Sequence, residues 1–299
     1  GIHDAWTDPG STWLGEQPSE RMRHLVRQFS ERRSTIGERN CSRGLTRRHF
    51  LVATLLVLAG CASVPGVAVG PASSGQPKNI IILFADGVAS THFEMARYAA
   101  RHLRNQPFTI TDTVFKEGTL GLLTSHAHEA IAPDSAAAGS AMSTGVKTTI
   151  GTIAMTPDGK PVRTVMEAAK ARGKRIGLVT TATVYDATPA AFSVHAKTRR
   201  DSQALVDQYL ALEPDVILGG GSDYFLPAGA PGGKRKDGKD VIAAFQAKGY
   251  QVARNVRELR AAAGPRLLGL FAEEDMNHEI DRDAGSEPSM AEMAEAAYR

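Results

Sequence analysis

Cysteine and net charge are both scarce in this sequence. The 299 residues contain two cysteines, Cys41 and Cys61, and both precede the part that has the pattern of a folded domain. From about Lys78 onward there is no cysteine, which excludes a domain held together by disulfides. Lysine plus arginine number 35 against 32 aspartates plus glutamates, and the arginines gather near the N-terminus. The high isoelectric point therefore gives no support for nucleic-acid binding by the folded domain.

Apolar runs of membrane-spanning length are also missing. The run Phe50–Ala59 falls well short of the roughly 20 residues that a membrane helix requires. A twin arginine, Arg47-Arg48, precedes this run, and small residues follow it. We therefore interpret residues 41–60 as a twin-arginine export signal rather than as a buried helix.

The residues around this signal predict the destination of the protein. Leu58–Cys61 resembles a bacterial lipobox, whose cleavage would leave Cys61 free for lipid attachment; the alternative is an ordinary signal peptide cleaved nearby. Residues 61–78 are rich in Gly, Pro, Ala and Ser and predict a flexible tether. Residues 1–40 have little hydrophobic pattern and are assigned no function, as expected of an upstream region translated from a misplaced start. We expect an exported protein, either periplasmic or anchored to the membrane as a lipoprotein.

Apolar runs and helical patterns alternate from Asn79 onward, where we place the folded domain, residues 79–299. Near-continuous apolar runs such as NIIILFAD are typical of parallel strands that are buried on both faces. The alternation predicts an α/β fold with a mostly parallel central sheet flanked by helices on both faces. The predicted strands are 79–86, 119–124, 175–181, 215–221, 250–253 and 266–272, and the predicted helices are 92–103, 136–142, 162–172, 202–212, 241–248 and 256–263.

Three segments that follow predicted strands carry polar residues, and ligands of such sheets bind at the carboxyl ends of the strands. The first segment is Asp86, which ends the apolar run NIIILFA and is followed by Gly87. A carboxylate at that place is costly to bury unless it is paired or bound to a metal. Taken alone, however, this aspartate is more typical of a turn or of a helix N-cap.

The second segment is Asp134-Ser135, followed by a helix of very small residues. The free amides and the dipole of a helix start favour an anion, so Ser135 would serve as a nucleophile beside a bound phosphate. The alternative is that Asp134 or Ser135 only caps the helix. The sequence has no GxSxG elbow, and the nearby His126 and His128 do not form a serine-hydrolase pattern. A serine without a base requires a metal ion to lower its pKa.

The third segment is DATPAAFSVHAKTR, which begins at Asp186. Thr188 and the proline after it open a helix in the favoured way. The planar fork of donors on Arg199 suits a phosphate group, although beside Arg200 it is also typical of an ordinary surface arginine. We interpret His195 as a structural residue rather than as a metal ligand.

The strings NIIILFADG, PDSAAAGSAMSTGVKT and DATPAAFSVHAKTR, in this order and spacing, resemble the alkaline phosphatase family. The middle string is the most specific, because a D-S-A start before a small-residue helix that ends in T-G-V-K-T is close to the signature of that family. The weaker strings DVILGGGSDYF and LLGLFAEEDM extend the resemblance over residues 79–299. This range is expected to be the first half to two thirds of the catalytic domain of the family.

The resemblance implies roles for individual residues. Ser135 matches the nucleophile that becomes phosphoserine, and Arg199 matches the arginine that clamps the phosphate oxygens. Asp86 matches a carboxylate that bridges a zinc ion and the magnesium ion, and Thr188 matches a hydroxyl ligand of magnesium. The activity implied is hydrolysis of phosphate monoesters at a site with two zinc ions and one magnesium ion.

Two aspartates are implied as supporting residues. Asp186 matches a position that in some members orients a magnesium-bound water, and Asp134 adjoins the nucleophile. The other ligands of the family, a glutamate with further aspartates and histidines, have no match up to Arg299, and the acidic residues from Glu273 to Asp281 match a loop that precedes them. We therefore expect the 299-residue chain to be inactive by itself and the parent protein to be active.

Other interpretations stay open. A phosphodiesterase or sulfatase of the same superfamily would carry a different nucleophile in different local strings, a lipid-anchored phosphate-binding protein would need no reactive serine, and a degraded gene remnant would have no activity. The expected partners are small phosphomonoesters, with no nucleic acid and with a membrane contact only through a lipid on Cys61. The family often forms homodimers, but no residue here indicates an interface.

Overall fold

The computed structural model describes residues 78–299, so the predictions of an export signal, a lipobox at Cys61 and a tether lie outside the described residues. The chain divides after Ile81, and Ile82–Arg299 form one compact unit. No helix in the described part is both long enough and apolar enough to cross a bilayer. The elements are α3 (Ser90–Arg104), the π-helix η2 (Ile110–Val114), α4 (Phe115–Glu117), α5 (Ser135–Thr144), α6 (Val165–Lys170), β1 (Gly177–Thr183), α7 (Ala187–Ala191), α8 (Ser202–Leu212), β2 (Val216–Gly220), the 3₁₀ turn η3 (Ser222–Phe225), α9 (Val241–Ala247), β3 (Gln251–Ala253), α10 (Val256–Ala261), β4 (Leu267–Leu270) and α11 (Met290–Tyr298).

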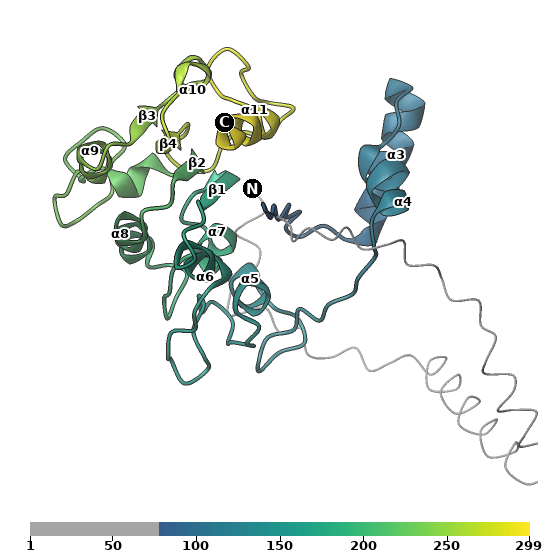
Figure 1. Ribbon diagram of the computed structural model, residues 1–299, viewed down its shortest axis with the longest axis horizontal. Helices are drawn as coiled ribbons and strands as arrows, with labels where there is room; N and C mark the ends of the chain where they lie inside the picture. Colours follow the sequence, from purple (N-terminus) through teal and green to yellow (C-terminus); the bar gives the residue numbers. More distant parts are fainter. Residues whose placement is uncertain (1–77) are drawn as a thin grey trace, which may run out of the picture. The chain divides into compact units, whose positions relative to one another are not determined.

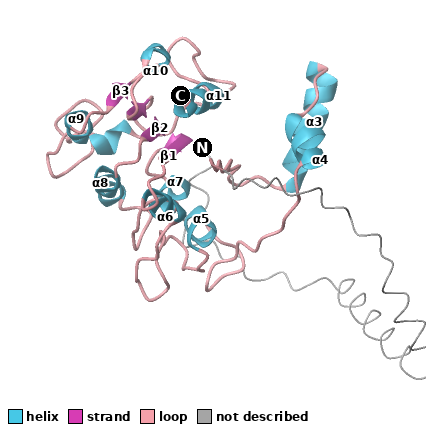
Figure 2. Cartoon of the chain, viewed as in Figure 1, coloured by secondary structure: helices cyan, strands magenta, loops and turns pink. Residues whose placement is uncertain are grey.

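A four-stranded sheet with the order β1-β2-β4-β3 forms the centre of this unit (Figures 1 and 2). All of its pairings are parallel, with Leu178 opposite Ile217 and Ile217 opposite Leu268. Parallel strands require crossover connections, and helices supply them here. The predicted α/β class with a mostly parallel sheet is therefore confirmed.

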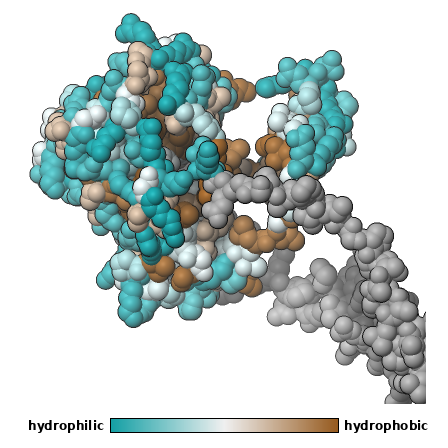
Figure 3. All heavy atoms as spheres, viewed as in Figure 1, coloured by the Kyte–Doolittle hydropathy of each residue, from teal (hydrophilic) through white to brown (hydrophobic). Residues whose placement is uncertain are grey.

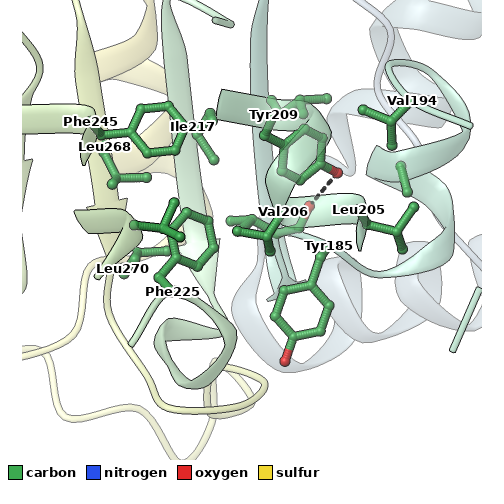
Figure 4. Close-up of a cluster of buried hydrophobic side chains, with 14 of the residues drawn as sticks. Tyr185, Val194, Leu205, Val206, Tyr209, Ile217, Phe225, Phe245, Leu268 and Leu270 are labelled. Carbon is green, nitrogen blue, oxygen red and sulfur yellow. Dashed lines mark hydrogen bonds between the residues drawn. The ribbon is translucent and has the colours of Figure 1, made fainter. Parts of the chain in front are cut away.

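The two faces of the sheet carry separate apolar cores. Successive side chains of a strand point to opposite faces, so neighbouring residues of β2 enter different cores. Ile217 and Leu268 pack with α8 and α9 residues such as Tyr209 and Phe245 (Figure 4). Val216 and Leu218 belong to the second core, to which α10 and α11 contribute. Helices thus cover both faces of the sheet, as the sequence predicts.

Two predicted strands, 79–86 and 119–124, do not form, and this part of the prediction is wrong. Both segments are apolar but exposed: the exposed fraction is 79% for Leu83 and 98% for Leu122. Figure 3 shows apolar surface along the connection between α4 and α5, which contains the second segment. An apolar run becomes a strand only where a neighbouring strand pairs with its backbone, and neither segment has such a neighbour among residues 78–299.

The predicted helices all form, within three residues of their predicted bounds. Their starts follow from side-chain caps. Thr164 and Glu167 form a capping box at the start of α6, and Asp240 accepts a hydrogen bond from the amide of Ala243 at the start of α9. Each such cap satisfies an amide that the first turn of a helix leaves without a partner.

A glycine run ends β2 at the carboxyl edge of the sheet. A Cβ atom on Gly220 would lie 2.1 Å from the carbonyl oxygen of Glu274, so only glycine allows this approach. The amide of Gly221 donates to the carbonyl oxygens of Ala272 and Glu274 at 3.1 and 2.9 Å. The segments that follow β2 and β4 therefore pack together at the edge where ligands of parallel sheets bind.

Candidate active site

Ser135 is the first residue of α5, and the capping role belongs to its neighbour. Oδ1 of Asp134 accepts hydrogen bonds from the amides of Ala137 at 2.9 Å and Gly151 at 3.2 Å. The half-buried Ser135 has no hydrogen-bond partner for its hydroxyl among the residues that the structure describes. The alternative of a plain helix cap therefore fits Asp134, and the hydroxyl of Ser135 stays available for another contact.

Small residues bring α5 against α7. A Cβ atom on Gly139 would lie 3.1 Å from the Cβ of Ala191 and 3.9 Å from the Cα of Thr188. The hydroxyl of Ser143 donates to the carbonyl oxygen of Ala191, and the hydroxyl of Ser140 accepts from the amide of Ala154 at 2.7 Å. Because larger side chains would separate the helices, the small residues of α5 allow its middle and its C-terminal end to pack close to α7.

Asp86 and Thr188 are in direct contact. The hydroxyl of Thr188, in α7, donates to Oδ2 of Asp86 at 2.8 Å, which joins residues 102 positions apart. Gly87 has a φ of 68°, so the chain turns immediately after Asp86. The rings of Phe84 and Phe192 meet edge to face at 5.5 Å beside this contact. The two residues that the sequence predicts as metal ligands are therefore brought together, although the strand predicted before Asp86 is not formed.

Arg199 joins the second and third predicted segments. Its Nη2 atom donates to Oδ1 of Asp186 at 2.8 Å, and its Nη1 atom donates to Oδ2 of Asp134 at 3.3 Å. Partial burial lowers the pKa of the guanidinium, but the two carboxylates outweigh this effect, and the pKa lies above its usual value. Two of the five N–H groups of this side chain make these bonds, so the others are available to a ligand.

Two buried tyrosines hold the turn between β1 and α7. The hydroxyl of Tyr209 donates to the carbonyl oxygen of Val184 at 2.8 Å (Figure 4), and the hydroxyl of Tyr185 donates to Oδ1 of Asp223 at 2.6 Å. Burial raises the pKa of both tyrosines, which therefore remain neutral donors. These contacts fix the backbone directly before Asp186. The sequence analysis missed them, and its only available signal was that Tyr185 adjoins a predicted site residue.

The donors at this contact are oxygen atoms. Asp86 and Thr188 offer a carboxylate and a hydroxyl oxygen, which are ligands that Mg²⁺ accepts. Among the described residues there is no group of three or more His, Cys, Asp or Glu side chains that could hold a metal ion. Asp86 and Thr188 alone therefore do not make a complete site for any metal, and further donors would be needed.

The chain is similar in sequence to known proteins. The sequence model described as alkaline phosphatase matches residues 77–299. The chain is 33% identical over 264 residues to the repressible alkaline phosphatase of Saccharomyces cerevisiae, covering 82% of this chain and 46% of that protein. It is also 33% identical over 230 residues to alkaline phosphatase 3 of Bacillus subtilis, covering 74% of this chain and 47% of that protein.

A solved structure resembles the described unit. The alkaline phosphatase of Thermus thermophilus superposes with a TM-score of 0.67 at 39% sequence identity, over 71% of this chain and 44% of that chain. The chain therefore spans about half the length of the curated relatives and of the solved structure that it matches.

Proposed function

Because the chain belongs to the alkaline phosphatase family, we propose that it supplies the nucleophile and the phosphate-binding arginine of a phosphomonoester hydrolase. The observation that carries the proposal is the position of Arg199, whose guanidinium bonds both Asp134, next to Ser135, and Asp186, two residues before Thr188. This one side chain joins the helix start that carries the serine to the helix that contacts Asp86.

Family membership suggests the role of Ser135, and the contacts of Arg199 suggest the role of the arginine. The oxygen of Ser135 attacks phosphorus, a new O–P bond forms, and the bond from phosphorus to the ester oxygen breaks, so that the alcohol leaves with a proton. Water then breaks the O–P bond to Ser135 and releases phosphate. Arg199 binds two oxygens of the phosphoryl group with its remaining donors, while Asp134 and Asp186 hold the plane of the guanidinium fixed.

The charges of the site explain why a cation is required. Asp86, Asp134 and Asp186 contribute three carboxylates against the single guanidinium of Arg199, and a phosphate monoester is itself an anion. Without a further positive charge these groups would repel the substrate. Metal ions are used generally in this family, and we propose that Asp86 and Thr188 hold part of a magnesium site. When bound, metal ions supply Lewis acidity and lower the pKa of the serine hydroxyl.

Two zinc ions complete the proposed site, with donors that the described residues do not provide. The 299-residue chain alone is therefore expected to bind no zinc at this site and to hydrolyse no phosphomonoester. Adding zinc and an aryl phosphate to the purified chain tests this expectation, and turnover that is lost in Ser135→Ala would contradict it. We also propose that the protein is exported by the twin-arginine route, carries a lipid on Cys61 and forms a homodimer.

Trapping of the phosphoserine tests the nucleophile in the parent protein. Incubation with labelled inorganic phosphate at acid pH is expected to label the protein, and Ser135→Ala is expected to abolish both label and turnover. The matched control is Ser202→Ala, because Ser202 also follows an aspartate N-cap at a helix start, where Asp201 accepts from the amide of Ala204. Label that persists in Ser135→Ala, or that is lost equally in Ser202→Ala, would refute the assignment. Turnover of a phosphodiester above that of a monoester would favour the diesterase alternative.

A further inference from the structure

The segment 195–199, which ends at Arg199, is fastened at its start by a glutamine of α8. The amide of His195 donates to Oε1 of Gln208 at 2.9 Å, and Nε2 of Gln208 donates to the carbonyl oxygen of His195 at 2.7 Å. One side chain therefore satisfies both backbone groups of His195, which belong to the two peptide bonds on either side of its Cα, and so restrains the backbone at this residue. Thirteen positions separate the two residues, and nothing in the sequence singles out this glutamine.

The rest of the segment is fastened by backbone bonds. Ala196 exchanges both of its backbone hydrogen bonds with Ile153, at 2.8 and 3.0 Å, and the amide of Arg199 donates to the carbonyl oxygen of Gly151 at 2.7 Å. The guanidinium of Arg199 bonds the carboxylates of Asp134 and Asp186, and the carboxylate of Asp134 is also held by two backbone amides. A shift at the start of the segment would therefore change the direction of the arginine side chain at its end.

The ring of His195 provides a second anchor. Nδ1 lies 2.9 Å from the carbonyl oxygen of Ala154, and Nε2 lies 3.1 Å from Oε1 of Glu167. The ring therefore links the start of the segment to the backbone at Ala154 and to the carboxylate of Glu167. Burial raises the pKa of Glu167, but hydrogen bonds from Thr164 and His195 outweigh this effect and leave the pKa below its usual value. The other carboxylate oxygen of Glu167 caps α6.

We propose that Gln208 and Glu167 are positioning residues, which act through His195 to aim the guanidinium of Arg199 at the phosphoryl group. This inference rests on the proposed function, in which Arg199 binds phosphate. Neither residue is expected to touch the substrate. They would affect phosphate binding only through the backbone of residues 195–199 and the side chain of Arg199. Removing that arginine should therefore remove their effect on phosphate binding.

The test measures the dissociation constant of inorganic phosphate with the full-length, metal-loaded parent protein. Gln208→Leu removes both bonds to His195 and is expected to raise this constant about tenfold, which corresponds to about 1.4 kcal/mol. In an Arg199→Ala background the same substitution is expected to have no further effect, because the group that it misdirects is gone. The matched control is Gln203→Leu, which removes a glutamine of the same helix that bonds the amide of Lys236 instead.

Glu167 supplies a second pair of variants, which keeps the proposal testable if Gln208→Leu does not fold. Glu167→Gln can still cap α6 and, with both a donor and an acceptor on its amide, can still bond the His195 ring, so it is expected to keep the phosphate affinity. Glu167→Leu can do neither and is expected to lose it. A positioning role is overturned if Gln208→Leu leaves the phosphate affinity unchanged, or weakens it equally with and without Arg199. Unchanged affinity in Arg199→Ala itself would instead refute the proposed function, and with it this inference.

Discussion

Asp134 performs two tasks with its two carboxylate oxygens, and substitutions can separate them. Asp134→Ala removes the N-cap of α5, worth about 1 kcal/mol, and a second amide bond, from Gly151, worth about 1 kcal/mol. It also removes a partly exposed ion pair with Arg199, worth less than about 1 kcal/mol. The free energy of unfolding is therefore expected to fall by about 2–3 kcal/mol, the sum of these contributions.

Asp134→Asn is expected to lower the free energy of unfolding much less than Asp134→Ala does. Its side-chain oxygen can still accept from the amides of Ala137 and Gly151, but its NH₂ group then faces the guanidinium of Arg199, where two donors meet. The expected cost is below about 1 kcal/mol, the contribution of the partly exposed ion pair.

Urea unfolding of the wild type and both variants, followed by circular dichroism, measures these differences. The slope of the transition is expected to stay unchanged, so that midpoints report stability directly. Equal destabilisation by the alanine and asparagine variants would refute the division of labour between the two oxygens. A cost below about 0.5 kcal/mol for Asp134→Ala would refute the capping role itself.

Three further predictions concern the frame around the site. The fully buried side chain of Arg235 makes four hydrogen bonds. Arg235→Ala is therefore expected to lower the free energy of unfolding, measured in urea, by about 2–4 kcal/mol, which is less than the loss of a wholly buried ion pair because the carboxylate partners reach water. A decrease under about 1 kcal/mol would contradict this. Gly220→Ala forces a Cβ atom onto a backbone oxygen of the loop after β4 and is expected to cost about 2–3 kcal/mol, whereas Gly229→Ala, which meets no atom within 4 Å, is the control and should cost far less. A hydrogen bond from the amide of Ser289 and a weaker contribution from Arg260 lower the pKa of Glu292 to about 2. The stability that this carboxylate contributes is therefore fully present above the pKa of an unfolded glutamate, about 4.3, and is lost as the pH falls from there toward 2. The difference in melting temperature between wild type and Glu292→Gln should shrink across that range, and a difference independent of pH would count against the assignment.

The fold could be predicted from the sequence where local pattern decides structure. The strands around Leu178, Ile217 and Leu268 are short apolar runs between helical patterns, and each forms with parallel partners. The runs 79–86 and 119–124 have the same pattern, yet they form no strand and are exposed. The apolar pattern of a segment indicates whether the segment can be buried. Whether a neighbouring strand is present to pair with it cannot be predicted from that local pattern.

The residues of the candidate site could be proposed from the sequence, but the contacts between them could not. Ser135, Asp86 and Thr188 were found because they belong to recognisable strings, and the structure brings Asp86 and Thr188 into contact. The two bonds of Arg199 span 65 and 13 positions, and no periodicity indicates such partners. Gln208 lies in a helix whose pattern explains only its apolar face, so its contact with the site segment appears only in three dimensions.

The contact of Gly139 with Ala191 sets the spacing between α5 and α7 by the size of two side chains. Replacing either residue by a larger one would push the helices apart by a fraction of the width of a methyl group, and with them Ser135 and Thr188. Natural variation at one of these positions should then be accompanied by a compensating change at the other. The geometry of this site would in that case be adjusted by residues that touch neither substrate nor metal.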